Sequence, residues 1–179
     1  MKLLFKKKQE CCGCTACKSV CPTHSIEMRP DNEGFLYPQI NSDTCFDCRK
    51  CKEVCAFQNG YDIPDHLVSP EVYALKHTSN EIRRISSSGG AFSAISDYIL
   101  LKSGVVYGAA FDTGFRVIHQ RAETAEERNA FCGSKYVQSD LGDVFRQIYD
   151  DLNKDIYVLF TGTPCQVSGL HMYLKKSGV

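Results

Sequence analysis

The sequence predicts an α+β fold built from two parts. Nine of the 11 cysteines lie between Cys11 and Cys55, in a region without long periodic segments. After residue 71, strand-like and helix-like segments alternate, which is typical of an α/β-type domain. Residues 59–71 lie between the two parts and are rich in Asn, Gly, Asp and Pro, so they predict a linker. We therefore expect one small domain at residues 1–58 and a second domain at residues 72–179.

The individual elements follow from local patterns in chain order. In the first part, two short strands are expected at Ile26–Met28 and near Phe35–Ile40, with a turn at Pro30–Gly34 between them. In the second part the patterns predict strands at Val72–His77, Val105–Phe111, Phe115–Arg121 and Ile156–Phe160, and helices at Ala91–Lys102, Leu141–Leu152 and after Thr161 to about Lys176. The second and third of these strands flank a short turn and are typical of a hairpin. With so few strands in about 110 residues, we expect the second domain to be incomplete.

Composition excludes several classes of protein. Lysine plus arginine and aspartate plus glutamate each number 21, so the net charge is zero, which argues against nucleic-acid binding. No apolar stretch approaches the roughly 20 residues of a membrane span. The only apolar run near the N-terminus, Leu3–Phe5, is too short for a signal-peptide core. We expect a cytoplasmic protein, and the composition leaves its oligomeric state open.

The number and placement of the cysteines favour ligands over disulfides. Eleven is an odd number, and a disulfide framework belongs to secreted proteins, for which no signal is present. In a reducing compartment, clustered thiols are typical of a metal or cofactor site.

The spacing of these cysteines identifies the site. Two runs follow the pattern C-x2-C-x2-C-x3-C, and Pro22 follows the first run where Ala56 follows the second. This is the run of bacterial dicluster ferredoxins, in which three cysteines of a run hold one [4Fe–4S] cluster and the fourth ligates the other. The pattern thus predicts two ligand sets: Cys11, Cys14, Cys17 and Cys55 for cluster 1, and Cys21, Cys45, Cys48 and Cys51 for cluster 2.

Zinc is the competing interpretation, because paired C-x2-C units also build zinc sites with four cysteine ligands. A zinc site does not require a third cysteine at the same spacing or a fourth cysteine after three further residues, and this chain has both in each of its two runs. Iron–sulfur clusters are therefore favoured. Two neighbouring clusters transfer single electrons, which predicts a redox partner protein or a small electron carrier. Cys12 falls outside both sets and is expected to pack beside the cluster, and Cys132 is expected to be a packing residue.

Three polar loops in the second part are candidate cofactor sites. They are Ser86–Ala94, Gly133–Asp140 and Thr161–Leu170, and two of them end where a helix is expected to begin. Helix N-termini bind anions through exposed N–H groups and the helix dipole, although serines and glycines at such places also merely cap helices. In the third loop, Cys165 falls in the first helical turn, where the dipole stabilises a thiolate, but a buried packing cysteine is an equal alternative.

Taken together, the dicluster run and these three ordered loops resemble the coenzyme F420 hydrogenase/dehydrogenase beta-subunit family over essentially the whole chain. The resemblance implies an iron–sulfur flavoprotein that passes electrons between a two-electron carrier at FAD and one-electron clusters, and it implies that residues 72–179 are the N-terminal part of a larger domain, with an incomplete flavin site. The electron donor and acceptor, whether F420, NAD(P)H or another carrier, stay open. By resemblance, the cofactor-binding residues are Ser87, Ser88, Gly89, Gly90, Gly133, Ser134, Lys135, Tyr136, Thr163, Cys165 and Gln166. The alternative is a ferredoxin-type carrier or interaction module without its own catalysis.

Overall fold

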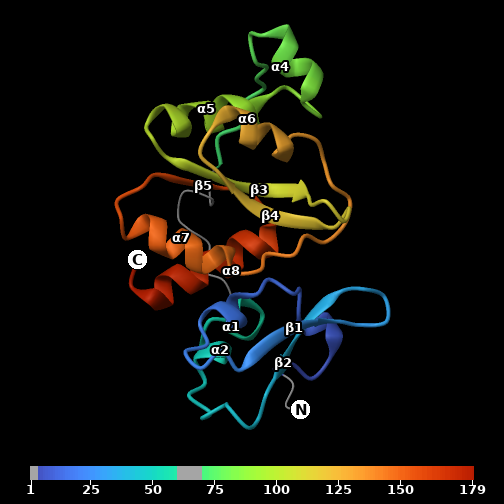
Figure 1. The fold of residues 1–179 in the computed structure, drawn as a ribbon, viewed down its shortest axis with the longest axis vertical. Coiled ribbons are helices and arrows are strands. Elements are labelled where there is room, and N and C mark those ends of the chain that lie inside the picture. The colour runs from blue at the N-terminus through green and yellow to red at the C-terminus, as the bar shows by residue number, and fades with distance from the viewer. Residues whose placement is uncertain (1–3, 60–69) are drawn as a thin grey trace. The chain divides into compact units, whose positions relative to one another are not determined.

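The computed structural model describes residues 4–59 and 70–179 (Figure 1). They divide into two compact units that do not follow the order of the chain. The first unit contains residues 4–59 together with Asp140–Asp150 and Gly162–Val179, and the second contains residues 70–139 together with Asp151–Thr161. The predicted linker lies largely at residues 60–69, outside the described residues.

The first unit holds short helices, one two-stranded sheet and two longer helices. Its elements are η1 (Lys8–Glu10), α1 (Ala16–Ser19), β1 (Ile26–Pro30), β2 (Leu36–Ile40), α2 (Lys50–Glu53), α3 (Ala56–Asn59), α7 (Val144–Leu152, of which the last two residues belong to the second unit) and α8 (Pro164–Ser177).

The predicted hairpin of the first unit is confirmed. Strands β1 and β2 pair antiparallel, with Ile26 opposite Ile40, and both isoleucines are buried. The Asp31 carboxylate accepts backbone N–H groups from Glu33 and Phe35, each at 3.0 Å, and so closes the turn. The buried ends of the two strands pack with Leu4 into a small apolar core.

Helices α7 and α8 pack within the first unit, which the sequence patterns do not predict. Phe145 of α7 stacks on Tyr173 of α8, with ring centroids 6.0 Å apart. Arg146 donates hydrogen bonds to three backbone carbonyls at the end of α1, those of Lys18 at 3.1 Å, Ser19 at 2.9 Å and Cys21 at 3.2 Å. Carbonyls at a helix end have no partner within the helix, so this arginine satisfies groups that the short helix leaves unpaired.

The second unit is built on a three-stranded sheet with the strand order β4-β3-β5. Strands β3 (Val105–Phe111) and β4 (Val117–Ala122) pair antiparallel as the predicted hairpin, and β5 (Val158–Phe160) pairs parallel to β3. The helices of this unit are α4 (Asn80–Ile85), α5 (Ala91–Leu101), α6 (Ala125–Arg128) and η3 (Asn129–Phe131). A core of buried and half-buried apolar side chains joins α5 and η3 to the sheet.

A polar network lies beneath this sheet. The Tyr107 hydroxyl donates to Asp151 Oδ2 at 2.7 Å, and Arg121 donates to both oxygens of the same carboxylate, from Nε at 2.7 Å and from Nη2 at 3.2 Å. The Asp151 side chain is only 8% exposed, so its charge is compensated almost entirely by these two partners.

Three sequence-based expectations for the second unit need correction. Residues 72–77 form no strand, because the side chains of Val72 and Tyr73 are 90% and 74% exposed and no strand of the described residues pairs with them. Strand β4 begins at Val117, because Phe115 adopts a left-handed backbone (φ 59°) in the turn. Strand β5 is short and half-buried, although its apolar sequence predicts full burial.

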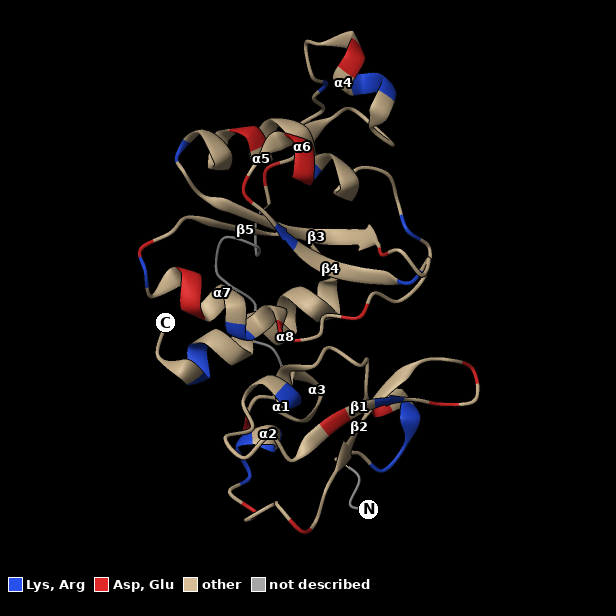
Figure 2. Cartoon of the chain, viewed as in Figure 1, with Lys and Arg blue, Asp and Glu red and all other residues tan. Residues whose placement is uncertain are grey.

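Two properties of the whole described chain bear on function. Lysine and arginine are spread over many elements, with acidic residues between them (Figure 2). None of the helices within residues 4–59 and 70–179 is both long and apolar enough to cross a membrane.

Candidate functional site

The repeated cysteine spacing gives a repeated backbone. Thr15 precedes α1 with φ 64° and ψ −1°, and Arg49 precedes α2 with φ 63° and ψ 2°. A residue other than glycine adopts this left-handed conformation only when its surroundings enforce it. Each helix begins directly after this residue, so the third cysteine of each run sits in the first turn of a short helix. The two runs therefore present their thiols in the same local geometry.

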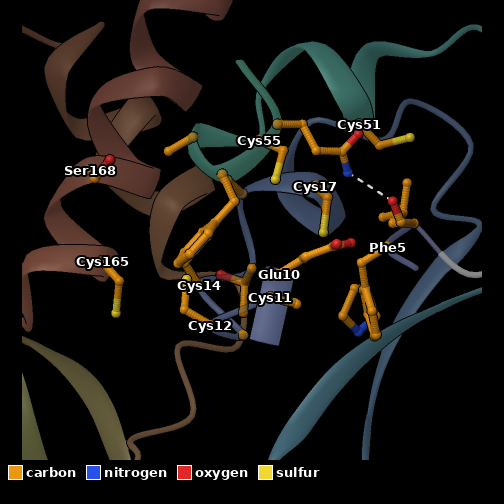
Figure 3. Close-up of a pocket in the computed structure, with 18 of the residues that line it drawn as sticks. Phe5, Glu10, Cys11, Cys12, Cys14, Cys17, Cys51, Cys55, Cys165 and Ser168 are labelled. Carbon is orange, nitrogen blue, oxygen red and sulfur yellow. Dashed lines mark hydrogen bonds between the residues drawn. The ribbon is translucent and has the colours of Figure 1, made fainter. Parts of the chain in front are cut away.

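One pocket of the first unit gathers the first predicted ligand set. Cys11, Cys14, Cys17 and Cys55 all line it, and three further cysteines, Cys12, Cys51 and Cys165, line it as well (Figure 3). The rest of its wall is largely apolar and includes Leu4, Phe5, Met28 and Pro38. The four predicted ligands, which are up to 44 residues apart, thus face one cavity, with Cys55 arriving from the second run.

A second pocket of the same unit gathers the second set. Its lining includes Cys21, Cys45, Cys48 and Cys51, with Ile26 and Ile40 of the hairpin on the apolar side. Here Cys21 arrives from the first run. Cys51 lines both pockets, so the two sites are neighbours.

The electrostatics of the thiols show the same grouping. Burial, together with repulsion from the neighbouring thiols of Cys12 and Cys55, raises the pKa of Cys11 to about 11. Burial likewise raises the pKa of Cys17, with added repulsion from Cys11, Cys55 and Cys51. Thiolates crowded in an apolar pocket repel one another, so their joint ionisation requires a cationic centre between them.

The pKa values of the thiols in the second pocket are shifted in the same way, with one exception. Burial raises the pKa of Cys51, and Cys21 and Cys48 add to the effect. The pKa of Cys21 is lowered, because hydrogen bonds from Thr23 and Ser25 outweigh the opposing effect of burial. The Ser25 N–H donates to Cys21 Sγ at 3.3 Å, which is the kind of N–H···S contact that stabilises a ligating thiolate.

Helix α8 lies directly against the first pocket. A Cβ atom placed on Gly169 would come within 2.8 Å of Cys14 Sγ and 3.0 Å of Cys14 Cβ. No side chain fits there without movement, so glycine at this position lets the helix approach a predicted ligand closely. Because α8 packs so closely here, Cys165 and Ser168 reach the wall of the cavity (Figure 3).

The second unit contains a separate, larger cavity of about 720 Å³. Its wall contains Ser86–Phe92 and Phe131–Ser134, with Tyr73–Leu75 and Thr161. The Ser134 N–H donates to Ser87 Oγ at 3.1 Å and joins two of the three polar loops. Six of the predicted cofactor residues line this cavity: Ser87, Ser88, Gly89, Gly90, Gly133 and Ser134.

The glycines of the predicted site have different surroundings. A Cβ on Gly89 would lie 2.5 Å from the Leu75 carbonyl oxygen, so this glycine admits the chain's own backbone rather than a ligand. Gly90 begins α5 with φ 85°, and Gly133 has φ 82° with open space beside it.

The remaining predicted cofactor residues lie elsewhere. Lys135 and Tyr136 are not among the residues that line the cavity, and Lys135 Nζ donates to the carbonyls of Ala130 and Cys132, each at 2.9 Å. Burial lowers the pKa of this lysine. Thr163, Cys165 and Gln166 begin α8 in the first unit, where the Thr163 N–H donates to Gln166 Oε1 at 2.9 Å.

Cys12 lines the first pocket, beside the predicted ligands, as the sequence led us to expect. Sequence reasoning missed the place of Cys165, which only the packing of α8 brings to this pocket. Within residues 4–59 and 70–179, no group of three or more His, Cys, Asp or Glu side chains is arranged to hold a single metal ion. The cysteines instead surround cavities, as the ligands of a multi-iron cluster do.

Comparison with known proteins identifies the first 59 residues more closely than the rest. Residues 10–59 match the family model of the 4Fe-4S dicluster domain. A search of curated proteins gives no match to the chain. The chain thus contains a ferredoxin-like 4Fe-4S domain, which indicates iron–sulfur clusters and iron–sulfur electron transfer.

Proposed function

We propose that the chain binds two [4Fe–4S] clusters and serves as the electron-transfer part of a flavin-linked oxidoreductase. The ligands are Cys11, Cys14, Cys17 and Cys55 for one cluster and Cys21, Cys45, Cys48 and Cys51 for the other. The observation that carries the cluster assignment is that each of two pockets is lined by one complete set of four, with the fourth cysteine of each run in the other run's pocket.

The residues of the chain hold and shield these clusters. Eight thiolates would bind the irons, and each bound cluster supplies reversible one-electron chemistry. Leu4, Phe5 and Met28 line the first pocket with apolar atoms, which keeps water from the ligands and strengthens the electrostatic interactions inside. The neighbouring pockets share Cys51, which supports exchange of electrons between the two sites.

The flavin part of the proposal is supported by the cavity of the second unit. Its volume of about 720 Å³ falls within the range of cofactor pockets, roughly 300–1,000 Å³. Hydroxyls of Ser87 and Ser88 and the open backbone at Gly133 offer hydrogen-bond donors to an anionic ligand such as the FAD diphosphate. We infer that residues 72–179 belong to the domain type of F420 hydrogenase/dehydrogenase beta subunits.

The flavin proposal is tested by anaerobic purification followed by a visible spectrum and titration with FAD. We expect a flavin absorption band at about 450 nm, above the broad absorbance of the iron–sulfur clusters at about 400 nm. Ser88→Trp, which fills the cavity, should weaken FAD binding at least about tenfold. Thr113→Trp, in the exposed turn between β3 and β4, is the matched control and should bind FAD normally.

The same experiment decides between a flavin-linked oxidoreductase and a ferredoxin-type electron carrier. Clusters without any affinity for FAD would leave a ferredoxin-type carrier. If FAD binds, reduction of the clusters by F420H2, NADPH or NADH then identifies the two-electron carrier, and the reverse reaction gives the direction.

A further inference from the structure

Two cysteines of the first pocket belong to neither predicted ligand set. Cys12 and Cys165 both line this pocket, and they are 153 positions apart in the chain. Neither is needed to complete a set of four thiolates. Their presence therefore needs an explanation beyond cluster binding.

The two thiols lie in contact. Cys12 makes side-chain hydrogen bonds with both Cys14 and Cys165, so it stands between a predicted cluster ligand and the thiol of α8. Figure 3 shows Cys165 on α8 at the same side of the pocket as Cys12 and Cys14. Because Gly169 has no side chain, the helix can lie this close to Cys14.

The two cysteines differ in the exposure of their neighbours. Cys12 and Cys165 are both half-buried, and the residues before Cys165, Gly162–Pro164, are exposed. Thr163 Oγ1 lies 3.1 Å from Cys165 Sγ and supplies a hydroxyl beside this sulfur. Cys12, in contrast, is next to the buried Gly13. A path thus runs from solvent through Cys165 and Cys12 to Cys14.

We propose that Cys12 and Cys165 form a redox-active dithiol/disulfide couple beside the first cluster, and that the chain thereby exchanges electrons with disulfide substrates. This rests on the proposed function, because the couple needs the clusters as its one-electron partners.

The electron balance of the couple matches the number of clusters. Oxidation of Cys12 and Cys165 forms one S–S bond of about 2.05 Å and releases two protons to solvent and two electrons, which two bound one-electron clusters would accept. In the opposite direction, two electrons and two protons break the bond and restore both thiols. Reduction of a substrate disulfide proceeds by exchange: Cys165 attacks one substrate sulfur, Cys12 then attacks Cys165 Sγ, and two substrate thiols leave.

The couple is tested on the cluster-loaded protein by thiol mapping. The protein is equilibrated anaerobically in glutathione buffers from fully reduced to fully oxidised, quenched in acid with N-ethylmaleimide, digested and analysed by mass spectrometry. We expect a peptide linked through Cys12 and Cys165 in the oxidised buffers and separately alkylated peptides in the reduced ones. Cys132→Ser should show the same linked peptide.

A reductive titration gives the second readout. The oxidised wild-type chain should take up two electrons more than Cys12→Ser or Cys165→Ser, because neither variant can form the disulfide. Iron should stay at about eight atoms per chain in all three proteins.

These experiments distinguish a failure of the proposed dithiol/disulfide couple from a failure of the proposed electron-transfer function. Separate alkylation of Cys12 and Cys165 in every buffer, with iron still at about eight, overturns the couple and leaves the electron-transfer function intact. A fall to about four irons in Cys165→Ser also overturns it, because Cys165 would then be a cluster ligand. Wild-type protein that holds no clusters contradicts the proposed function itself.

Discussion

Replacing Cys14 with alanine is expected to lower the iron content from about eight to about four atoms per chain. Cys14 lines only the first pocket, where it faces Cys11, Cys17 and Cys55. A cubane that loses one thiolate exposes an iron to solvent and is lost on purification, whereas the second pocket keeps its four thiolates. Iron and acid-labile sulfide measured per chain check this result, and Cys132→Ala, outside both pockets, is the control.

Double variants test which run supplies the fourth ligand. Cys14→Ala with Cys55→Ala removes two ligands of the same proposed cluster, so about four irons should remain. Cys14→Ala with Cys21→Ala removes one ligand from each cluster, so almost no iron should remain. If each run instead held its own cluster, these two outcomes would be exchanged.

Replacing Asp151 with asparagine is expected to have the second large effect, a loss of stability in the second unit. The carboxylate is 8% exposed and balances Arg121, whose side chain is 28% exposed. An amide removes the buried carboxylate and leaves the guanidinium with only the exposed Glu123 as counter-charge, which costs about 2 kcal/mol. Hydrogen exchange of the β3 and β4 amides measures this loss within the unit. Asp150→Asn, at the exposed neighbouring position, should change protection by less than about 0.5 kcal/mol.

The same carboxylate predicts a dependence on pH. Burial alone would raise the pKa of Asp151, but hydrogen bonds from Arg121 and Tyr107 outweigh it, and the pKa is lowered in the folded chain. A group with a lowered folded pKa stabilises fully above its unfolded pKa, about 3.9, and this stabilisation is lost as the pH falls through the folded value. The difference in β3 protection between wild type and Asp151→Asn should therefore be constant near neutral pH and shrink below about pH 4. A difference that stays constant to about pH 2 would contradict the ion pair.

Local patterns in the sequence were sufficient to predict the two hairpins, and they also predict the cysteine sets. The repeated spacing of the thiols is accompanied by a repeated backbone, as the paired left-handed residues Thr15 and Arg49 show. The strands Ile26–Pro30 and Leu36–Ile40 are bounded by a turn whose Asp31 supplies the closing hydrogen bonds. In each case the information lies within a few residues of the feature.

Long-range packing could not be predicted in this way. The placement of α7 and α8 in the first unit depends on contacts such as Arg146 with the end of α1 and Gly169 with Cys14, between residues more than 100 positions apart. The segment Val72–His77 resembles a strand in its apolar composition, but no strand of the described chain pairs with it. For the same reason Cys165 was assigned to a flavin loop by resemblance, whereas it lines the cysteine pocket of the first unit.

The most direct test of the account is the metal content and electron paramagnetic resonance spectrum of the anaerobically purified, dithionite-reduced chain. Two [4Fe–4S] clusters predict about eight irons and eight sulfides per chain, with the broadened signal of two neighbouring paramagnets that interact. Bound zinc without sulfide, or about four irons with the signal of an isolated cluster, would contradict it.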